Sequence, residues 1–440
     1  MTSAEADPGT VGPDRPRRFR GVLIDVAPLR HDHDFRLLWS GQVVSGIGNQ
    51  VTRIALPYQV FVLTGSTLAI AALTLVQLIP ILIFVLGAGS LADAIDRRRL
   101  LLVTQVLLAL SSLALVALAL VPAPPLAAIF AVAFVAASVG SVDQPTRSSA
   151  VPRLVPPLRL PAAIALNQLN FQVASVVGPA IGGLLIATIG LPGAYATDVL
   201  SFTASIGALL LMAPLPPTAV ARPGLAAVRE GLAFVRRRPA ILSTFVIDLD
   251  AMIFGMPTSL FPVLALETFG VGAAGLGLLA AAPGFGALVG AALSGWIPRV
   301  ARIGFGVIVA VIIWGAAITA FGVTTIAPSA VSFALALLFL AIAGGADVIS
   351  AVFRSTIVQL DTPDELRGRV SAIHILAVTS GPRIGDIEAA VVAAVVGPTF
   401  SVVSGGLLCL GGVAVVARRF PELAAHTLRQ VGREAGRPAA

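Results

Sequence analysis

Several ionisable side chains stand inside stretches of sequence that are otherwise apolar. Arg53 lies in the first such stretch, Asp248 near the middle of the chain, and Asp347 in a later stretch. A charge in hydrocarbon is costly, so we expect these side chains to face a protein interior or a water-filled pathway. A carboxylate can bind and release a proton, whereas Arg stays charged, so proton transfer would have to use the acids.

A second group of charges falls together within one late apolar stretch. Arg383 and Asp386 are three residues apart, and Glu388 follows shortly after. On a helix, residues three apart share one face, so Arg383 and Asp386 can neutralise each other. The alternative is that they line the surface that substrate or protons use. Asp250, two residues after Asp248, is a further ionisable candidate.

The amino-acid composition is typical of a protein embedded in a membrane. It has 57% hydrophobic and only 12% charged residues, with a mean hydropathy of +0.95, whereas soluble proteins carry about 25% charged residues. The apolar stretches have the length of ~20 residues that spans a bilayer core as a helix. The sequence therefore predicts an all-α membrane protein with twelve transmembrane helices, at about 37–62, 67–91, 100–121, 126–145, 163–188, 194–212, 241–265, 273–297, 304–324, 329–352, 371–395 and 399–417.

The loops between these segments alternate in charge. Arg clusters follow the second, fourth, sixth, eighth and tenth segments, while the intervening loops carry no Arg. By the positive-inside rule, both termini are predicted to be cytoplasmic. The predicted organisation is a disordered N-terminal tail, a six-helix half, a cytoplasmic linker, a second six-helix half and a C-terminal tail, at 1–34, 35–213, 214–240, 241–418 and 419–440.

Residue usage excludes several classes of function. The chain contains no Lys, so it has neither a P-loop ATPase site nor a Schiff-base Lys. Its single cysteine, Cys409, excludes an intrachain disulfide. The stretch at 31–34 alternates His and Asp, but it precedes the first helix, and we expect no metal there. No nucleophile–base pair is evident, so we expect neither an enzyme nor a cofactor. The net charge of +7 is explained by the cytoplasmic loops rather than by nucleic-acid binding.

The two halves repeat one another in sequence. The motif Gly178-Pro179-x-x-Gly182 recurs at 381–385, and Arg147-Ser148 recurs as Arg354-Ser355. The stretch 55–57 with Gly65 recurs at 260–262 with Gly270, and 89–91 recurs more weakly at 295–297, in the same order and at nearly the same spacing. Two parallel six-helix halves are typical of a transporter that rocks around a substrate site near the middle of the membrane.

At this point the sequence resembles the major facilitator superfamily. The stretch 89–98, GSLADAIDRR, is similar to the superfamily signature between helices 2 and 3, with Asp96 where Gly is usual. Gly178, Pro179, Gly182 and Gly183 resemble the helix-5 motif of drug antiporters, although the usual upstream Gly is Ala174. The stretches 35–42 and 354–370 resemble the branch of enterobactin exporters and drug-efflux proteins. The resemblance covers about residues 35–418.

The resemblance implies roles for particular residues. Helices 1, 4, 7 and 10 would line the cavity, which places Arg53 and Asn49 near it and makes Asp347 and Asp248 the first candidates for proton coupling, followed by Asp386. Relatives often carry Asp on helix 1 where this chain has Asn49. Arg383 and Glu388 would belong to the cavity or to the interface between the halves.

The resemblance also implies a gate and a hinge. Asp93, Arg97 and Arg98 would form a latch that pairs across the halves, and Asp143 and Arg147 could belong to the same network or form only a local pair. Asp93, Arg97 and Arg98 could instead serve only topology. Gly178, Pro179, Gly182 and Gly183 would allow close helix packing or act as a hinge.

The resulting hypothesis is a monomeric secondary transporter of the bacterial inner membrane. It would export amphipathic drug-like or siderophore-like small molecules by alternating access, against inward proton flow. One alternative is an importer or uniporter of a small metabolite on the same fold, because fold alone does not decide function. The other is a membrane receptor or scaffold that does not transport.

Overall fold

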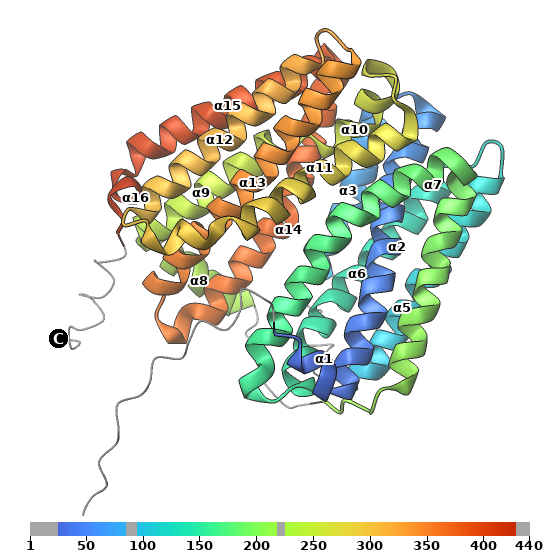
Figure 1. Ribbon diagram of the computed structural model, residues 1–440, viewed down its shortest axis with the longest axis horizontal. Helices are drawn as coiled ribbons and strands as arrows, with labels where there is room; N and C mark the ends of the chain where they lie inside the picture. Colours follow the sequence, from blue (N-terminus) through green and yellow to red (C-terminus); the bar gives the residue numbers. More distant parts are fainter. Residues whose placement is uncertain (1–24, 85–94, 218–224, 428–440) are drawn as a thin grey trace, which may run out of the picture.

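The computed structural model describes residues 25–84, 95–217 and 225–427. The described residues form two helical bundles that stand side by side, the N-terminal half in blue to green and the C-terminal half in yellow to red (Figure 1). The N-terminal half consists of α1 (Ala27–His31), α2 (His33–Thr64), α3 (Thr67–Phe84), α5 (Arg97–Leu120), α6 (Leu126–Leu154), η1 (Pro157–Arg159) and α7 (Leu160–Leu211).

The C-terminal half begins with an amphipathic helix and continues through the remaining membrane helices. Its elements are α8 (Leu225–Arg237), α9 (Pro239–Phe254), η2 (Thr258–Leu260), α10 (Phe261–Val263), η3 (Leu264–Thr268), α11 (Gly272–Ala292), η4 (Ser294–Arg299), α12 (Ile303–Thr324), α13 (Ala330–Asp361), α14 (Asp364–Val396), α15 (Pro398–Arg419) and α16 (Pro421–Ala425).

The long element α7 contains two membrane crossings. Gly190 interrupts it with φ of 74° and ψ of 179°, a conformation that glycine adopts without the steric penalty of a side chain. Among the described residues, nine helical segments are long and apolar enough to span a membrane, and one of them, 157–211, contains this interruption. The helices α2 and α14 have the length as well, with 32 and 33 residues, but are less apolar in composition. The predicted twelve-helix, all-α fold is confirmed.

The seventh span is not the continuous helix that its apolar sequence predicted. The helix α9 ends at Phe254, and a 3₁₀ turn, one turn of α-helix and a π-helical turn complete the crossing. Pro257 and Pro262 lack the N–H that a continuous helix would need. The span therefore consists of a regular first part and an irregular second part.

Parts of the predicted tails and linker are folded. The first helix begins at Ala27 rather than after residue 34, and Asp32 forms an ion pair with Arg159 at 2.9 Å. The predicted linker contains α8, whose Gly231 lies against Arg369 of α14. After α15, α16 returns to the start of α12, where the Gly304 N–H donates to the His426 carbonyl. The remainder of the tails and of the linker, 1–24, 218–224 and 428–440, lies outside the described residues.

The two halves meet through closely packed helices. The pairs α7–α11, α3–α14 and α2–α10 contact one another across the boundary. A side chain at Gly183 would place its Cβ 2.5 Å from the Ala273 carbonyl oxygen and 2.6 Å from the Gly277 Cα. Gly183 therefore permits direct backbone contact between α7 and α11. This contact lies toward the loops at Gly190 and Gly270, the end of the bundles without Arg clusters.

We predict that a methyl group at Gly183 weakens the contact between the halves. In Gly183→Ala, the added Cβ would meet backbone atoms that cannot rotate away, a clash that costs ~1–3 kcal/mol. The conformation described here should lose population by ~5- to 150-fold relative to the alternative conformation. Double electron–electron resonance between spin labels on the two halves would measure this. Gly207→Ala is the control, because nothing lies within 4 Å of its added Cβ, and an unchanged distance distribution in Gly183→Ala would contradict the prediction.

The predicted orientation can be tested with single cysteines. Cys409→Ser removes the single native cysteine, after which Leu158→Cys and Ala123→Cys each place one thiol in an exposed loop. We expect a membrane-impermeant maleimide to label Ala123→Cys in intact cells, and Leu158→Cys only after permeabilisation, because Leu158 lies beside the Arg cluster at 153–159. The reverse pattern would place the termini outside the cell.

Candidate functional site

A buried cluster of three charges joins two helices of the C-terminal half. Arg354 on α13 contacts Asp248 on α9, with 2.7 Å between Nη2 and Oδ1. The same nitrogen lies 3.6 Å from Oδ1 of Asp347, almost two helical turns earlier on α13. The side chain of Asp248 is 4% exposed and that of Asp347 is 44% exposed. The structure thus brings together the two acids ranked first from the sequence, through an Arg that the sequence analysis had treated only as a loop charge and a repeat marker.

Neighbouring polar groups complete this charge cluster of Asp248, Arg354 and Asp347. Arg354 donates through Nη1 to the Ser350 hydroxyl at 3.0 Å. His374 of α14 interacts electrostatically with Arg354 and stacks edge-on against Phe245 of α9 at 6.0 Å between ring centroids. These contacts link α9, α13 and α14. Removing one partner from a buried ion pair leaves an uncompensated charge, which is strongly destabilising.

Asp386 has a different set of partners from the one that its spacing suggested. Its Oδ1 accepts hydrogen bonds from the Thr258 hydroxyl at 2.6 Å and from the Ser259 N–H at 2.7 Å. Its carbonyl oxygen accepts a third from the Ser259 hydroxyl at 2.8 Å. Thr258 and Ser259 are the first two residues of η2. The break in the seventh span leaves backbone N–H groups there without helical partners. Asp386 thus caps the irregular second part of that span.

Arg383 directs its hydrogen bond elsewhere. Its guanidinium donates to the Thr379 carbonyl at 2.7 Å, one turn back on α14. Within the described ranges, no ion pair joins it to Asp386, so the expected neutralising pair is not formed by direct contact. Both residues still interact electrostatically with Arg53 of α2, which belongs to the other half. Arg53, Arg383 and Asp386 are therefore a group of charges at the boundary of the halves.

The two other residues predicted for the cavity lie close by in sequence but have simpler surroundings. Asn49 is exposed and lies one turn before Arg53 on α2. Glu388 is partly exposed on α14, two residues beyond Asp386. In the part of the chain that the structure describes, no hydrogen bond or ion pair involves either side chain. Their proposed cavity role rests on position alone.

Arg147, the counterpart of Arg354 in the sequence repeat, forms its ion pair within its own helix. Arg147 pairs with Asp143 one turn earlier on α6, with 2.7 Å between Nε and Oδ2. Asp143 Oδ1 also accepts hydrogen bonds from Thr104 at 2.6 Å and Gln105 at 2.9 Å, both on α5. Both charged side chains are buried. The pair ties α6 to α5 within one half, as the local alternative predicted.

The described part of the proposed latch also acts within the N-terminal half. Arg98 donates to the carbonyls of Leu209 and Leu210 at 2.7 and 2.6 Å, at the end of α7. Arg97 donates to the Ser149 hydroxyl of α6 at 3.1 Å. Asp93, the acid on which the latch depends, lies outside the described residues. A contact across the halves through these residues stays a prediction.

Comparison with known proteins decides the family. Residues 24–434 match the family described as transmembrane secretion effector. The enterobactin exporter EntS of Citrobacter koseri is 27% identical over 402 residues, covering 88% of this chain and 92% of the relative. EntS of Escherichia coli O81 is 26% identical over 405 residues, covering 90% and 96%. The chain belongs to this family of major facilitator transporters.

Solved structures agree on the fold. A POT family transporter in complex with 5-aminolevulinic acid superposes with a TM-score of 0.72 at 12% identity, covering 89% of this chain and 97% of that one. A bacterial homologue of the iron transporter ferroportin in an inward-facing state gives 0.68 at 15% identity, covering 89% and 99%. The family match and the apolar helices together identify the chain as a multi-pass membrane transporter.

The glycine motif of this transporter serves two interfaces. Added Cβ atoms at Gly178 and Gly182 would meet Gln50 and Val51 of α2, inside the N-terminal half. Gly183, as described above, faces α11 of the other half. An added Cβ at Gly277 would in turn lie 2.6 Å from the Pro179 carbonyl oxygen. Close packing is thus observed for all four positions of the motif, and the hinge remains a proposal.

Sequence reasoning missed Asp198, a buried carboxyl group in the second crossing of α7. It accepts hydrogen bonds from Thr52 of α2 at 2.6 Å and Ser112 of α5 at 2.7 Å, and it lies beside Ser201. These hydroxyl groups satisfy the carboxyl group without a described ion pair. An acid within an apolar segment is the same signal that identified Asp248, so the sequence did contain the indication.

Asp250 occupies a separate environment from Asp248. It lies against α15, where it interacts with the Cys409 thiol and where an added Cβ at Gly412 would lie 1.9 Å from its Oδ1. Asp250 therefore faces away from the charge cluster although it is only two residues along the same helix. No group of three or more possible metal ligands gathers among the described residues.

We predict that Arg354→Gln destabilises the protein and that a second substitution restores much of the loss. Arg354→Gln leaves the Asp248 charge buried without its partner, at a cost of ~3–5 kcal/mol. The double variant Arg354→Gln/Asp248→Asn removes both charges and should unfold at a higher temperature than Arg354→Gln alone. Thermal unfolding in detergent measures both. Arg237→Gln, at an exposed position, is the control, and a double variant no more stable than the single one would show that the charges do not interact.

Proposed function

We propose that this transporter exports siderophore-like or other amphipathic, drug-like small molecules across the bacterial inner membrane, driven by inward proton flow. The similarity to enterobactin exporters over about nine-tenths of the chain supports siderophore export. Both termini would be cytoplasmic, and substrate would leave by alternating access between the two halves. Drug-like substrates are the broader class suggested by the helix-5 motif.

The proposal of proton coupling rests on one observation, which is that two carboxyl groups share one Arg. Asp248 and Asp347 both lie within reach of Arg354. With one acid protonated, the cluster is neutral, and with both ionised it carries one net negative charge. A charge is costly in a low-dielectric surrounding, so the balance between these states can be changed by access to water. The partly exposed Asp347 is the proposed entry point for the proton, and Asp248 holds Arg354.

His374 is the other titratable group facing this cluster, and its charge would add to that of Arg354. Its protonation would favour ionised carboxylates, so its substitution should change the pH dependence of transport without abolishing it. Asp386 ranks below Asp347 and Asp248, because its carboxylate already accepts two hydrogen bonds at the break in the seventh span. Protonating Asp386 would disturb that cap.

Substrate contact is proposed at the boundary of the halves. Arg53 and Arg383 belong to opposite halves and interact electrostatically with each other and with Asp386. Two like charges repel, and a substrate with acidic or electron-rich oxygen atoms would relieve this repulsion by accepting hydrogen bonds from both guanidinium groups. Asn49 and Glu388 lie on the same helices and would border that site. Rocking of the halves would then separate the two Arg side chains and release the substrate.

The decisive experiment measures proton movement in everted vesicles. Vesicles that contain the protein are given a pH gradient, and a catecholate siderophore or an amphipathic dye is added. We expect the substrate to dissipate the gradient with the unaltered protein, and Asp347→Asn to lose this activity by at least ~tenfold. Asp250→Asn is the matched control, since it removes a neighbouring carboxylate of α9 that faces α15.

The outcomes of this experiment distinguish the proposed function from its alternatives. Dissipation in Asp250→Asn but not in Asp347→Asn or Asp248→Asn supports proton-coupled export through the charge cluster. Transport of labelled substrate that is independent of pH, with the cluster variants still active, would favour a uniporter or importer. Binding of substrate without any accumulation or depletion would favour a receptor, and export would be abandoned.

A further inference from the structure

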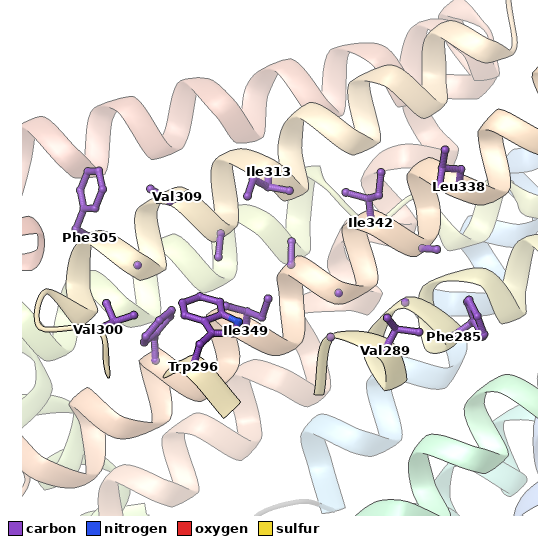
Figure 2. Close-up of a pocket in the computed structure, with 18 of the residues that line it drawn as sticks. Phe285, Val289, Trp296, Val300, Phe305, Val309, Ile313, Leu338, Ile342 and Ile349 are labelled. Carbon is purple, nitrogen blue, oxygen red and sulfur yellow. The ribbon is translucent and has the colours of Figure 1, made fainter. Parts of the chain in front are cut away.

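An apolar cavity opens on the surface of the C-terminal half. It has a volume of about 640 Å³ and lies between α11, α12, α13 and the short helix η4. Figure 2 shows Phe285 and Val289 of α11, Phe305, Val309 and Ile313 of α12, and Leu338, Ile342 and Ile349 of α13 arranged around it. The side chains of Phe285, Phe305 and Ile342 are 55%, 53% and 40% exposed, so the groove faces the surrounding membrane.

The two ends of this groove differ in chemistry. Toward the start of α12, its lining includes Arg302 and Trp296. Arg299, in η4, is exposed beside them. Neither Arg side chain has a described hydrogen bond or ion pair, and the stretch 293–303 contains no acid. Tryptophan is favoured where hydrocarbon meets the polar headgroups. This end therefore combines an interfacial aromatic ring with two cations available to an anion.

The length of the groove matches one leaflet of a bilayer. Along α12 it extends from Arg302 to Ile313, a distance of ~16 Å at 1.5 Å rise per residue. Half of a hydrocarbon core is ~15 Å. The polar end thus stands at headgroup level when the apolar end reaches the middle of the membrane. The Arg-rich side is the predicted cytoplasmic side, where anionic lipids attract basic residues.

We propose that this groove is a binding site for an anionic phospholipid. One acyl chain lies along Val309, Ile313 and Ile342, and the phosphate accepts hydrogen bonds from Arg302 and Arg299. The acyl chain would rest on Ala310 and Ala346. These two residues also border the small void next to Asp347, Ser350 and Arg354. A lipid in the groove is therefore one layer of side chains away from the charge cluster.

Binding can be measured without any transport assay, so its result is independent of the proposed export function. The purified protein is incubated with equal amounts of phosphatidylglycerol and phosphatidylethanolamine of the same acyl chains, and retained lipid is counted by native mass spectrometry. We expect preferential retention of phosphatidylglycerol. Arg299→Gln/Arg302→Gln should weaken that retention roughly fivefold for each Arg removed. The control Arg418→Gln/Arg419→Gln removes two exposed charges from the corresponding end of α15.

A second variant tests the apolar part of the site. Ile342→Trp fills the groove and should also reduce retention, whereas Val415→Trp, at a 64% exposed position on α15, should not. Equal retention of both lipids, or equal retention by the Arg299→Gln/Arg302→Gln protein and its control, would overturn the proposal and indicate surrounding bulk lipid only. Displacement of bound lipid by a siderophore or dye, lost in Ile342→Trp but kept in Val415→Trp, would assign the groove to substrate instead. Should Ile342→Trp fail to fold, the Arg variants alone decide the question.

Discussion

A carboxyl group inside a bilayer has no water to receive hydrogen bonds from, so it must find donors on neighbouring helices. Much of the described architecture follows from how each acid meets that requirement. Asp143 uses an Arg on its own helix together with donors from α5. Asp198 uses hydroxyl groups from two other helices. Asp248 uses an Arg from α13. Each set of partners joins neighbouring helices. The sets differ in whether the negative charge of the carboxyl groups is balanced by Arg.

The corresponding Arg residues of the two halves show that difference most directly. Arg147 and Arg354 occupy matching positions in the sequence repeat, yet Arg147 has one carboxylate and Arg354 has two within reach. The position of Asp143 in the first half corresponds to Ser350 in the second, and the acid is supplied by α9 instead. The N-terminal pair is balanced in charge and local. The C-terminal cluster has two carboxyl groups for one Arg, and the surplus carboxyl group is why proton binding is proposed there.

The sequence was sufficient for the fold, because twelve apolar segments and alternating loop charges depend only on local composition. It was sufficient to find Asp248 and Asp347, since acids in apolar segments stand out. It could not supply Arg354 as their shared partner, because that contact depends on how α9 packs against α13. Spacing on one helix suggested that Arg383 pairs with Asp386, but the cap of a broken neighbouring span took precedence. Pro257 and Pro262 did signal that break, although the apolar composition around them resembled an uninterrupted helix.

The irregular seventh span has a mechanical consequence. Its later pieces, η2 and α10, contact α3 and α2 of the other half, whereas its first piece, α9, carries Asp248. A continuous α-helix transmits rotation and translation along its length, because each turn is bonded to the next. Here α9 ends at Phe254 and the 3₁₀ turn begins only at Thr258, so no continuous helix joins the two pieces. The later pieces can keep their contacts with the N-terminal half while α9 tilts, so the second bundle need not move as one rigid body.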